Sequence, residues 1–259
     1  MNRRKIIQHI LNTQQNKHKS YLEIGTGKGK NFVSINAHYK VGVDPIPPSK
    51  RVARSLNDTC KYYSMTSDEF FLNAGESEKG VKYDVIFADG LHEYSQIYRD
   101  ITHSLDHLAP NGVIVAHDCK PTNEVMALPP DLYSLVDLEV KKSNHFDWTG
   151  DVWKAVVRLR SFHHDLLVFT LDCDFGCAVI TRGEPESSLN FSLPEIEAMD
   201  FHDLKNDYDG LLNLKHPSYL YNFLLRSGHQ KNFGRRPLLA LLSWLFTPHS
   251  EKIRPRIKQ

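Results

Sequence analysis

The stretch Tyr21-Leu-Glu-Ile-Gly-Thr-Gly-Lys-Gly29 decides the fold of this chain. An apolar strand that runs into three alternate glycines permits a sharp turn and lets a ligand approach the backbone closely. A second apolar stretch, Tyr39–Val43, ends on the carboxylate of Asp44. A glycine loop after one strand and an acid at the tip of the next predict a nucleoside-binding crevice in an open α/β sheet.

The spacing of the glycines indicates which nucleoside is bound. A dinucleotide site has the pattern G-x-G-x-x-G, and Lys30 occupies the place of its third glycine. Glu23 is expected to point toward the crevice, where an acid suits a positively charged amino acid group better than a pyrophosphate. Asp44 can accept hydrogen bonds from both ribose hydroxyls. These features favour S-adenosylmethionine over NAD.

The chain resembles the class I S-adenosylmethionine-dependent methyltransferases from residue 21 to residue 182. The stretches Tyr83-Asp-Val-Ile-Phe-Ala-Asp-Gly-Leu-His92 and Gly112-Val-Ile-Val-Ala-His-Asp-Cys119 resemble the subfamily with an Asp-Gly-x-His signature after its fourth strand (methyltransferase domain family 24). Macrolide-sugar O-methyltransferases and cephalosporin-biosynthesis methyltransferase-like proteins are of this kind. The expected cofactor-binding residues are Glu23, Gly25, Thr26, Gly27, Gly29, Asp44, Ser67, Asp68 and Asp89.

Alternating strands and helices predict a Rossmann-like, doubly wound α/β sheet of seven strands, mostly parallel with an antiparallel last strand. The expected strands are residues 21–24, 39–43, 61–65, 83–88, 113–116, 166–171 and 177–182. The expected helices are residues 3–11, 30–37, 51–56, 93–108 and 151–160, with Asp68 and Asp151 as N-caps. Residues 120–150 are expected to form an irregular acceptor lid. The methyltransferase domain is predicted to span residues 1–184, and a helical appendage with a basic tail residues 185–259.

Asp89 ends the fourth strand and His117-Asp118 end the fifth, so these side chains should meet at the carboxyl edge of the sheet. In metal-dependent O-methyltransferases an acid after the fourth strand and an acidic pair after the fifth hold a divalent ion. The resemblance therefore implies Asp89, His117 and Asp118 as ligands of Mg²⁺ or Mn²⁺, although His117 replaces the first acid of the pair. An imidazole ligand favours Mn²⁺, Fe²⁺ or Zn²⁺ over Mg²⁺.

His92 lies three residues after Asp89, where related enzymes carry a basic residue that acts as general base. We therefore expect His92 and Asp89 to be catalytic, and the reaction to be O-methylation of a small molecule or sugar. Two alternatives stay open: a metal-free methyltransferase, and a nonenzymatic cofactor-binding subunit of a biosynthetic complex. The other histidines that we considered, His145, His163 and His164, have no motif around them.

The composition is ordinary for a globular protein, with 41% hydrophobic and 24% charged residues. No apolar run is long enough to cross a bilayer. The first residues lack the apolar stretch of a secretory signal, so we expect a cytoplasmic protein. The cysteines are expected to be reduced, although a bridge or metal pair between the last two is an alternative; they are Cys60, Cys119, Cys173 and Cys177.

The net charge of +1 conceals an asymmetry. From Arg226 to the end there are eight Lys/Arg and one acid, so this tail carries +7 and the rest of the chain −6. A basic tail can bind phosphates, anionic lipid or an acidic partner, but the acidic remainder makes nucleic acid an improbable acceptor. The apolar residues 237–246 are too few to span a membrane and predict a docked helix or a contact in a homo-oligomer.

Overall fold

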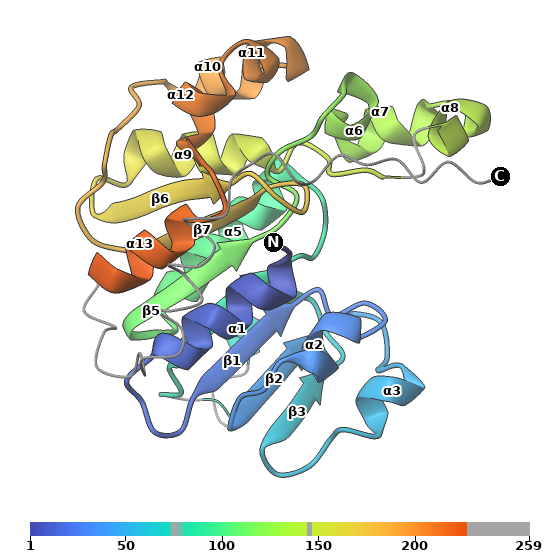
Figure 1. Cartoon of the computed structure of the whole chain (residues 1–259). Helices are drawn as coiled ribbons and strands as arrows, with labels where there is room; N and C mark the ends of the chain where they lie inside the picture. The colour runs from blue at the N-terminus through green and yellow to red at the C-terminus, as the bar shows by residue number, and fades with distance from the viewer. Residues whose placement is uncertain (74–77, 79, 144–146, 227–259) are drawn as a thin grey trace, which may run out of the picture.

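The computed structural model of the chain describes residues 1–73, 78, 80–143 and 147–226. One twisted sheet crosses the molecule, with helices on both faces (Figure 1). The strands are β1 (Ser20–Ile24), β2 (Tyr39–Val43), β3 (Cys60–Tyr63), β4 (Tyr83–Ala88), β5 (Leu108–Ala116), β6 (Leu166–Leu171), β7 (Cys177–Arg182) and β8 (Leu214–Lys215). The helices are α1 (Arg3–Thr13), α2 (Lys30–Ser34), α3 (Lys50–Ala53), α4 (Ser67–Asn73), α5 (Tyr94–Leu105), α6 (Glu124–Ala127), α7 (Pro130–Leu135), α8 (Leu138–Ser143), α9 (Trp153–Phe162), α10 (Leu193–Ala198), α11 (Phe201–Asn206), α12 (Tyr208–Leu212) and α13 (Tyr219–Arg226).

The strand order of the sheet is β3-β2-β1-β4-β5-β7-β6-β8. Strand β7 runs antiparallel to both of its neighbours, and the other pairs are parallel. The predicted Rossmann-like, mostly parallel fold is confirmed. The described residues contain one strand more than the seven expected, because Leu214 and Lys215 pair with Thr170 and Leu171 at the end of β6.

Each face of the sheet carries its own apolar core. Helices α5 and α9 bury their apolar stripes on one face, where residues of α10, α11 and α12 join them. Helices α1, α2 and α13 cover the other face. Every residue of β4 is buried, as expected for a strand covered on both sides.

The direction of the chain through the sheet reverses between β1 and β4. From β1 it moves outward through β2 to β3, and it then returns to β4 on the other side of β1. Loops that leave the two strands in opposite directions open a crevice at their carboxyl ends. The N–H of Asp89 donates to the carbonyl of Ile24 at 2.9 Å, so the two strand ends lie side by side there.

Two predicted helix caps were wrong. Asp68 lies within the first turn of α4, and Thr66 caps this helix instead: the Thr66 hydroxyl accepts from the N–H of Glu69 at 3.2 Å, and the Glu69 carboxylate accepts from the N–H of Thr66 at 2.8 Å. This reciprocal pair is a capping box. Asp151 does not cap α9; its carboxylate accepts from the N–H of Tyr94, the first residue of α5, at 2.8 Å.

Residues 120–143 are not irregular as expected, because they contain the short helices α6, α7 and α8. Asn123 caps α6 through a hydrogen bond from the N–H of Met126 at 3.0 Å. Pro130 begins α7, and a proline is favourable at that position because its missing N–H would have no partner within the helix.

The division of the chain at residue 184 stays a prediction. Helices α10 to α13 contribute buried residues to both cores. The basic tail beyond Arg226 and the apolar residues 237–246 lie outside the described residues, as does His145. Among the described helices, none combines the length and the apolar character needed to cross a bilayer.

Candidate active site

The glycine loop after β1 packs directly against the loop after β4. Gly25 has a φ of +81°, and its N–H donates to the carbonyl of Val43 at 2.8 Å. A Cβ at this position would lie 2.1 Å from the carbonyl oxygen of Asp89. Only glycine meets both conditions, because it accepts the left-handed conformation and has no side chain to clash.

Asp44, at the tip of β2, holds the same loop from the other side. Its Oδ2 accepts from the N–H of Gly27 at 2.8 Å, and its Oδ1 accepts from the N–H of Ile46 at 2.9 Å. The side chain is fixed by these bonds and is 7% exposed. Each carboxylate oxygen still has a lone pair for a ligand hydroxyl.

A cavity of about 450 Å³ lies between these loops. Its far wall comes from the start of α4 and from α5, where Ser67 donates to the carboxylate of Asp100 at 2.6 Å and Gln96 donates to the same oxygen at 3.0 Å. Six of the predicted cofactor residues line the cavity: Gly25, Gly27, Asp44, Ser67, Asp68 and Asp89.

A second cavity, of about 360 Å³, adjoins the first. Gly25, Gly27 and Asp89 line both cavities. The rest of its wall combines ionisable side chains at the ends of β4 and β5 with residues of the segment that precedes α9; it includes Arg3, Thr26, His92, His117, Asp118, Trp148 and Phe175.

Two predicted cofactor residues line neither cavity, Gly29 and Glu23. Gly29 shapes the turn, since its N–H donates to the carbonyl of Thr26 at 2.8 Å. Glu23 does not point into the crevice as expected. Side chains alternate along a strand, so Glu23 faces the same side as Tyr21, whose hydroxyl donates to it at 2.5 Å, while the amide of Asn31 donates at 2.9 Å.

Burial raises the pKa of Glu23 from its ordinary 4.5 to about 8. The folded protein then keeps a proton that the unfolded chain releases near pH 4.5, so this group makes the protein less stable as the pH rises from about 4.5 to 8. Glu23→Gln should remove this loss and add up to about 4 kcal/mol at pH 8.5 relative to wild type. Urea unfolding at pH 5 and pH 8.5 measures the difference. Glu197→Gln, at an exposed glutamate, is the control, and equal pH slopes for wild type and Glu23→Gln would contradict the assignment.

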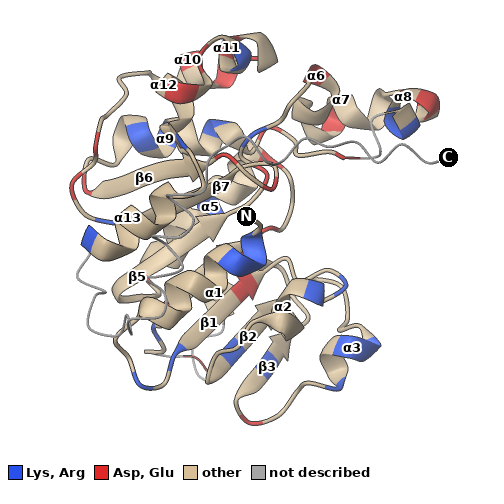
Figure 2. Ribbon diagram, in the orientation of Figure 1, with Lys and Arg blue, Asp and Glu red and all other residues tan. Residues whose placement is uncertain are grey.

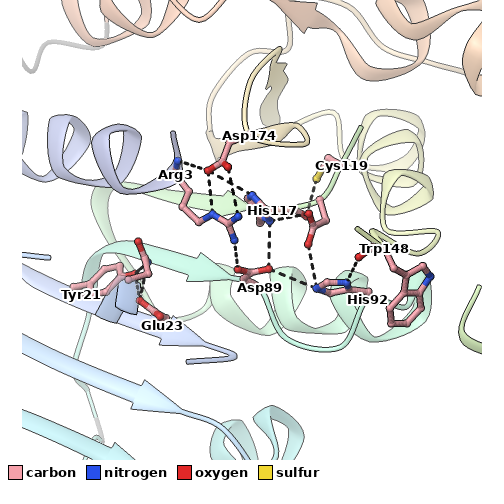
Figure 3. A network of polar contacts seen from close by, with 11 residues as sticks. Arg3, Tyr21, Glu23, Asp89, His92, His117, Cys119, Trp148 and Asp174 are labelled. Carbon is pink, nitrogen blue, oxygen red and sulfur yellow. Dashed lines mark hydrogen bonds and ion pairs between the residues drawn. The ribbon is translucent and has the colours of Figure 1, made fainter. Parts of the chain in front are cut away.

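His92 lies between the two strand-end carboxylates (Figure 3). Its Nδ1 is 2.8 Å from the carbonyl oxygen of Trp148, which can only accept, so Nδ1 carries the proton. Its Nε2 lies 3.1 Å from Asp118 and 3.7 Å from Asp89. Burial opposes a charge on this ring, but both carboxylates favour it and together raise the pKa of His92.

His117 lies behind this pair and is 2% exposed. Its Nδ1 is 2.9 Å from Asp118 and 3.4 Å from Asp89, and its Nε2 is 3.7 Å from Asp174. Burial opposes the charged ring, but the three carboxylates raise the pKa of His117 well above the ordinary value. The three predicted metal ligands are therefore close together, and their role as ligands stays a prediction.

Arg3, at the start of α1, adds a positive charge to this cluster. Its guanidinium lies 2.8 Å from Asp89 and 3.0 Å from Asp174, and its backbone N–H donates to Asp174 at 2.7 Å. Burial alone would raise the pKa of Asp89, but contacts with His117, His92 and Arg3 lower it. The charged groups lie close together in Figure 2, where the blue start of α1 faces red residues of the neighbouring loops.

The backbone at this site is strained. Asp118 has a φ of +59°, and Asp174 and Phe175 have φ values of +52° and +59°. Residues other than glycine rarely adopt such conformations, and they are enriched at functional sites.

Sequence reasoning missed several residues of the cluster and the cavities, among them Arg3, Gln96, Asp100 and Asp174. Asp100 carried a usable signal, since an acid within the apolar stripe of a helix must find a buried partner. Arg3 and Asp174 carried none, because they lie 171 residues apart in the sequence and meet only in the folded protein.

A family model described as a methyltransferase domain matches residues 22–119, which extend from β1 to the loop after β5. The chain carries a methyltransferase domain. This match confirms the resemblance to methyltransferases over these residues.

Solved structures of methyltransferases show a distant likeness to the domain. An O-methyltransferase from Bacillus cereus, complexed with SAH, is 19% identical with a TM-score of 0.47, over 69% of this chain and 80% of that one. A methyltransferase from Podospora anserina, bound to SAH, is 18% identical with a TM-score of 0.47, over 64% and 72%. An O-methyltransferase from Streptomyces achromogenes involved in tomaymycin synthesis is 13% identical with a TM-score of 0.44, over 70% and 79%. A search of curated proteins finds no match.

Proposed function

We propose that the methyltransferase domain transfers the methyl group of S-adenosylmethionine to a hydroxyl group of a small molecule or sugar. The observation that carries this proposal is the meeting of the two cavities at Gly25, Gly27 and Asp89. One cavity has the features of a nucleoside site and the other contains a base between carboxylates. Holding donor and acceptor in line across such a boundary can supply most of the rate of a direct displacement.

The larger cavity is the proposed donor site. S-adenosylmethionine would supply a methyl group on a positively charged sulfur. Asp44 would accept hydrogen bonds from the ribose hydroxyls, while Ser67 and Asp68, at the start of α4, would lie along the adenine. Gly25 and Gly27 would allow the amino acid part to approach the backbone. Glu23 would act from behind the loop, through Asn31, which it contacts.

The smaller cavity is the proposed acceptor site. Trp148 stacks on Tyr133 with ring centroids 4.8 Å apart, and its indole N–H donates to the carbonyl of Leu128 at 2.8 Å. These contacts hold a flat aromatic wall beside His92, whose ring centroid is 5.3 Å from that of Trp148. An aromatic wall facing polar side chains suits a ring-shaped acceptor with hydroxyl groups, such as a sugar or a phenol.

His92 is the proposed general base. The Trp148 carbonyl keeps the proton on Nδ1, so the lone pair of Nε2 is available for the proton of the acceptor hydroxyl. Asp118 and Asp89 would stabilise the imidazolium that forms. A base that is close to neutral pKa and held in place contributes roughly 10²- to 10⁴-fold to a rate.

A divalent cation fits the same carboxylates. An oxygen of Asp89, an oxygen of Asp118 and a ring nitrogen of His92 lie within 4.8 Å of one another, so an ion held by the two carboxylates would lie beside the proposed base. Mg²⁺ or Mn²⁺ would be held by Asp89 and Asp118, with His117 as the predicted nitrogen ligand, and would lower the pKa of an acceptor hydroxyl. The metal-free alternative has its own support, because Arg3 already supplies a positive charge 2.8 Å from Asp89.

The proposal is tested with the purified full-length chain, S-adenosylmethionine and a panel of sugars, phenols and aliphatic alcohols, by measuring S-adenosylhomocysteine formed. Turnover that requires a hydroxyl acceptor supports it. Turnover only with amines, thiols or nucleic acid would overturn the choice of acceptor. A cytoplasmic location and a homo-oligomer are further parts of the proposal that fractionation and light scattering can test.

Exhaustive chelation should lower the turnover at least about tenfold, because an ion that acidifies the hydroxyl contributes several kcal/mol to the transition state. Added Mg²⁺ or Mn²⁺ should restore the rate. Asp118→Asn should raise the concentration of ion needed for half of the full rate. Activity that survives chelation unchanged would decide for the metal-free mechanism, in which Arg3 provides the positive charge.

A further inference from the structure

A second group of ligand atoms lies on the far side of the His117 ring from His92. Cys177 begins β7, and Asp174 belongs to the turn between β6 and β7. A ring nitrogen of His117, a carboxylate oxygen of Asp174 and the sulfur of Cys177 all lie within 4.8 Å of one another. Figure 3 shows Asp174 and His92 on opposite sides of His117. None of these contacts is used by the proposed methyl transfer.

The register of β5 against β7 brings His117 and Cys177 together. Strands β5 and β7 are antiparallel neighbours with Ala116 opposite Ala178, so the next residues, His117 and Cys177, face each other where the strands end. The turn is anchored to the segment after β5 by two hydrogen bonds, from Cys119 N–H to the Gly176 carbonyl at 3.1 Å and from Lys120 N–H to the Phe175 carbonyl at 2.7 Å.

The turn is also packed too closely to move away. Gly176 has a φ of +85°, and a Cβ there would lie 2.6 Å from the backbone nitrogen of Lys120. The position of Asp174, two residues earlier, is therefore fixed by backbone contacts and by its bonds to Arg3. The three ligand residues are held by rigid elements, as a binding site requires.

The imidazole of His117 has carboxylates within ion-pair distance, Asp118 at 2.9 Å and Asp174 at 3.7 Å, but it forms no well-aligned hydrogen bond. It is 2% exposed, and neither ring nitrogen forms a hydrogen bond with any described residue. Buried polar atoms without a hydrogen bond are costly and rare in native proteins. Cys177 is fully buried as well. Asp174 has one oxygen occupied by Arg3, while its Oδ1 has a single long contact of 3.5 Å to the Arg3 guanidinium.

We propose that a ring nitrogen of His117, a carboxylate oxygen of Asp174 and the sulfur of Cys177 form a binding site for a zinc-class transition-metal ion. Sulfur, nitrogen and oxygen donors together suit Zn²⁺ and Co²⁺ and do not suit Mg²⁺. The thiol proton of Cys177 leaves to the solvent when the sulfur binds the ion. The side chain of Cys173 is hydrogen-bonded to Cys177, so it would help to hold the Cys177 sulfur in place without binding the ion itself.

The Nδ1 side of the His117 ring faces a carboxylate, as is common for histidines that bind a metal through the other nitrogen. A histidine that binds a metal through one nitrogen commonly donates the other N–H to a carboxylate. Nδ1 of His117 lies 2.9 Å from Asp118, so a small rotation of the ring would align this bond. His117 then belongs to the second site, and the ion of the proposed reaction would be held by oxygens alone, which suits Mg²⁺. This gives a reason for a histidine where the resemblance leads one to expect an acid.

Co²⁺ is the probe, because a cobalt–thiolate bond gives an absorption band in the near ultraviolet that carboxylate and imidazole ligands do not give. The full-length chain, stripped of metal under a phosphine reductant, should bind one Co²⁺ with this band, and Zn²⁺ should displace it. Cys177→Ser should abolish the band. Asp174→Asn, which leaves the buried thiol in place, should weaken Co²⁺ binding by at least the roughly 10- to 100-fold that loss of an outer-shell partner costs.

Two control variants separate this site from the proposed reaction. Cys60→Ser, at a buried thiol in β3, should leave the band unchanged. Asp89→Asn should also keep the band while the metal response of methyl transfer is lost. The inference is overturned if the folded wild type shows no band at one equivalent of Co²⁺, if the band survives Cys177→Ser, or if Asp89→Asn removes it. A Cys173–Cys177 disulfide that resists the reductant would overturn it too.

Discussion

Replacing His92 with alanine should lower kcat for methyl transfer by roughly 10²- to 10⁴-fold, the contribution of a positioned general base. The affinity for S-adenosylmethionine should change little, because His92 lines the smaller cavity and not the larger one. Stopped assays of S-adenosylhomocysteine formation measure the first quantity, and calorimetric titration measures the second. Loss of kcat without loss of donor binding is the expected signature of a group that acts on the acceptor.

A conservative variant distinguishes proton transfer from hydrogen bonding. His92→Gln can still donate to the Trp148 carbonyl, which lies 2.8 Å from Nδ1, but glutamine accepts no proton, so it should be nearly as inactive as alanine. His164→Ala, at an exposed histidine outside both cavities, is the control. If His92→Gln kept most of the activity, His92 would be a positioning residue and the base would lie elsewhere.

The pH dependence of kcat should report the protonation of His92. Asp89 and Asp118 raise the pKa of His92, although burial opposes them. The protonated ring cannot act as a base, so kcat should fall as the pH drops through a pKa above the ordinary 6.5. Asp118→Asn removes one of the charges that raise the pKa, so it should move this limb of the profile to lower pH.

The parts of the site that the sequence predicts correctly are those set by strand ends. Asp44, Asp89 and Asp118 each follow an apolar strand, and carboxyl ends of parallel strands meet at one edge of a sheet. The local sequence pattern is sufficient to predict these residues, because the parallel connections between the strands bring the strand ends together. The orientation of Glu23 was available from the same logic, since the two-residue period of a strand places it on the face of Tyr21.

The groups that sequence reasoning missed depend on packing between distant segments. Arg3 reaches Asp89 and Asp174 because the apolar stripe of α1 packs across the sheet and brings the start of the helix to the crevice. Asp151 has the residue type of a helix cap, yet its partner is the N–H of Tyr94, 57 residues earlier. No window of sequence contains both members of either pair.

Replacing Gly25 with alanine should lower Tm by roughly 5–15 °C and remove the stabilisation that S-adenosylhomocysteine gives the wild type. The left-handed backbone costs alanine about 1–2 kcal/mol. The Cβ would also meet the Asp89 carbonyl at 2.1 Å, and forcing an atom into a packed site adds about 1–3 kcal/mol. Because both contacts are backbone, neither loop can relax by turning a side chain.

Gly80 provides a matched control for the conformational part of this cost. Its φ is +80°, close to the +81° of Gly25, but a Cβ there would meet nothing within 4 Å. Gly80→Ala should therefore lose only the left-handed preference, about 1–2 kcal/mol, and keep its response to S-adenosylhomocysteine. Thermal unfolding with and without this ligand compares the two variants. If both variants lost the same Tm and the same stabilisation by S-adenosylhomocysteine, the loops after β1 and β4 would separate at little cost. The wall that the two cavities share would then not be the rigid boundary that in-line transfer needs.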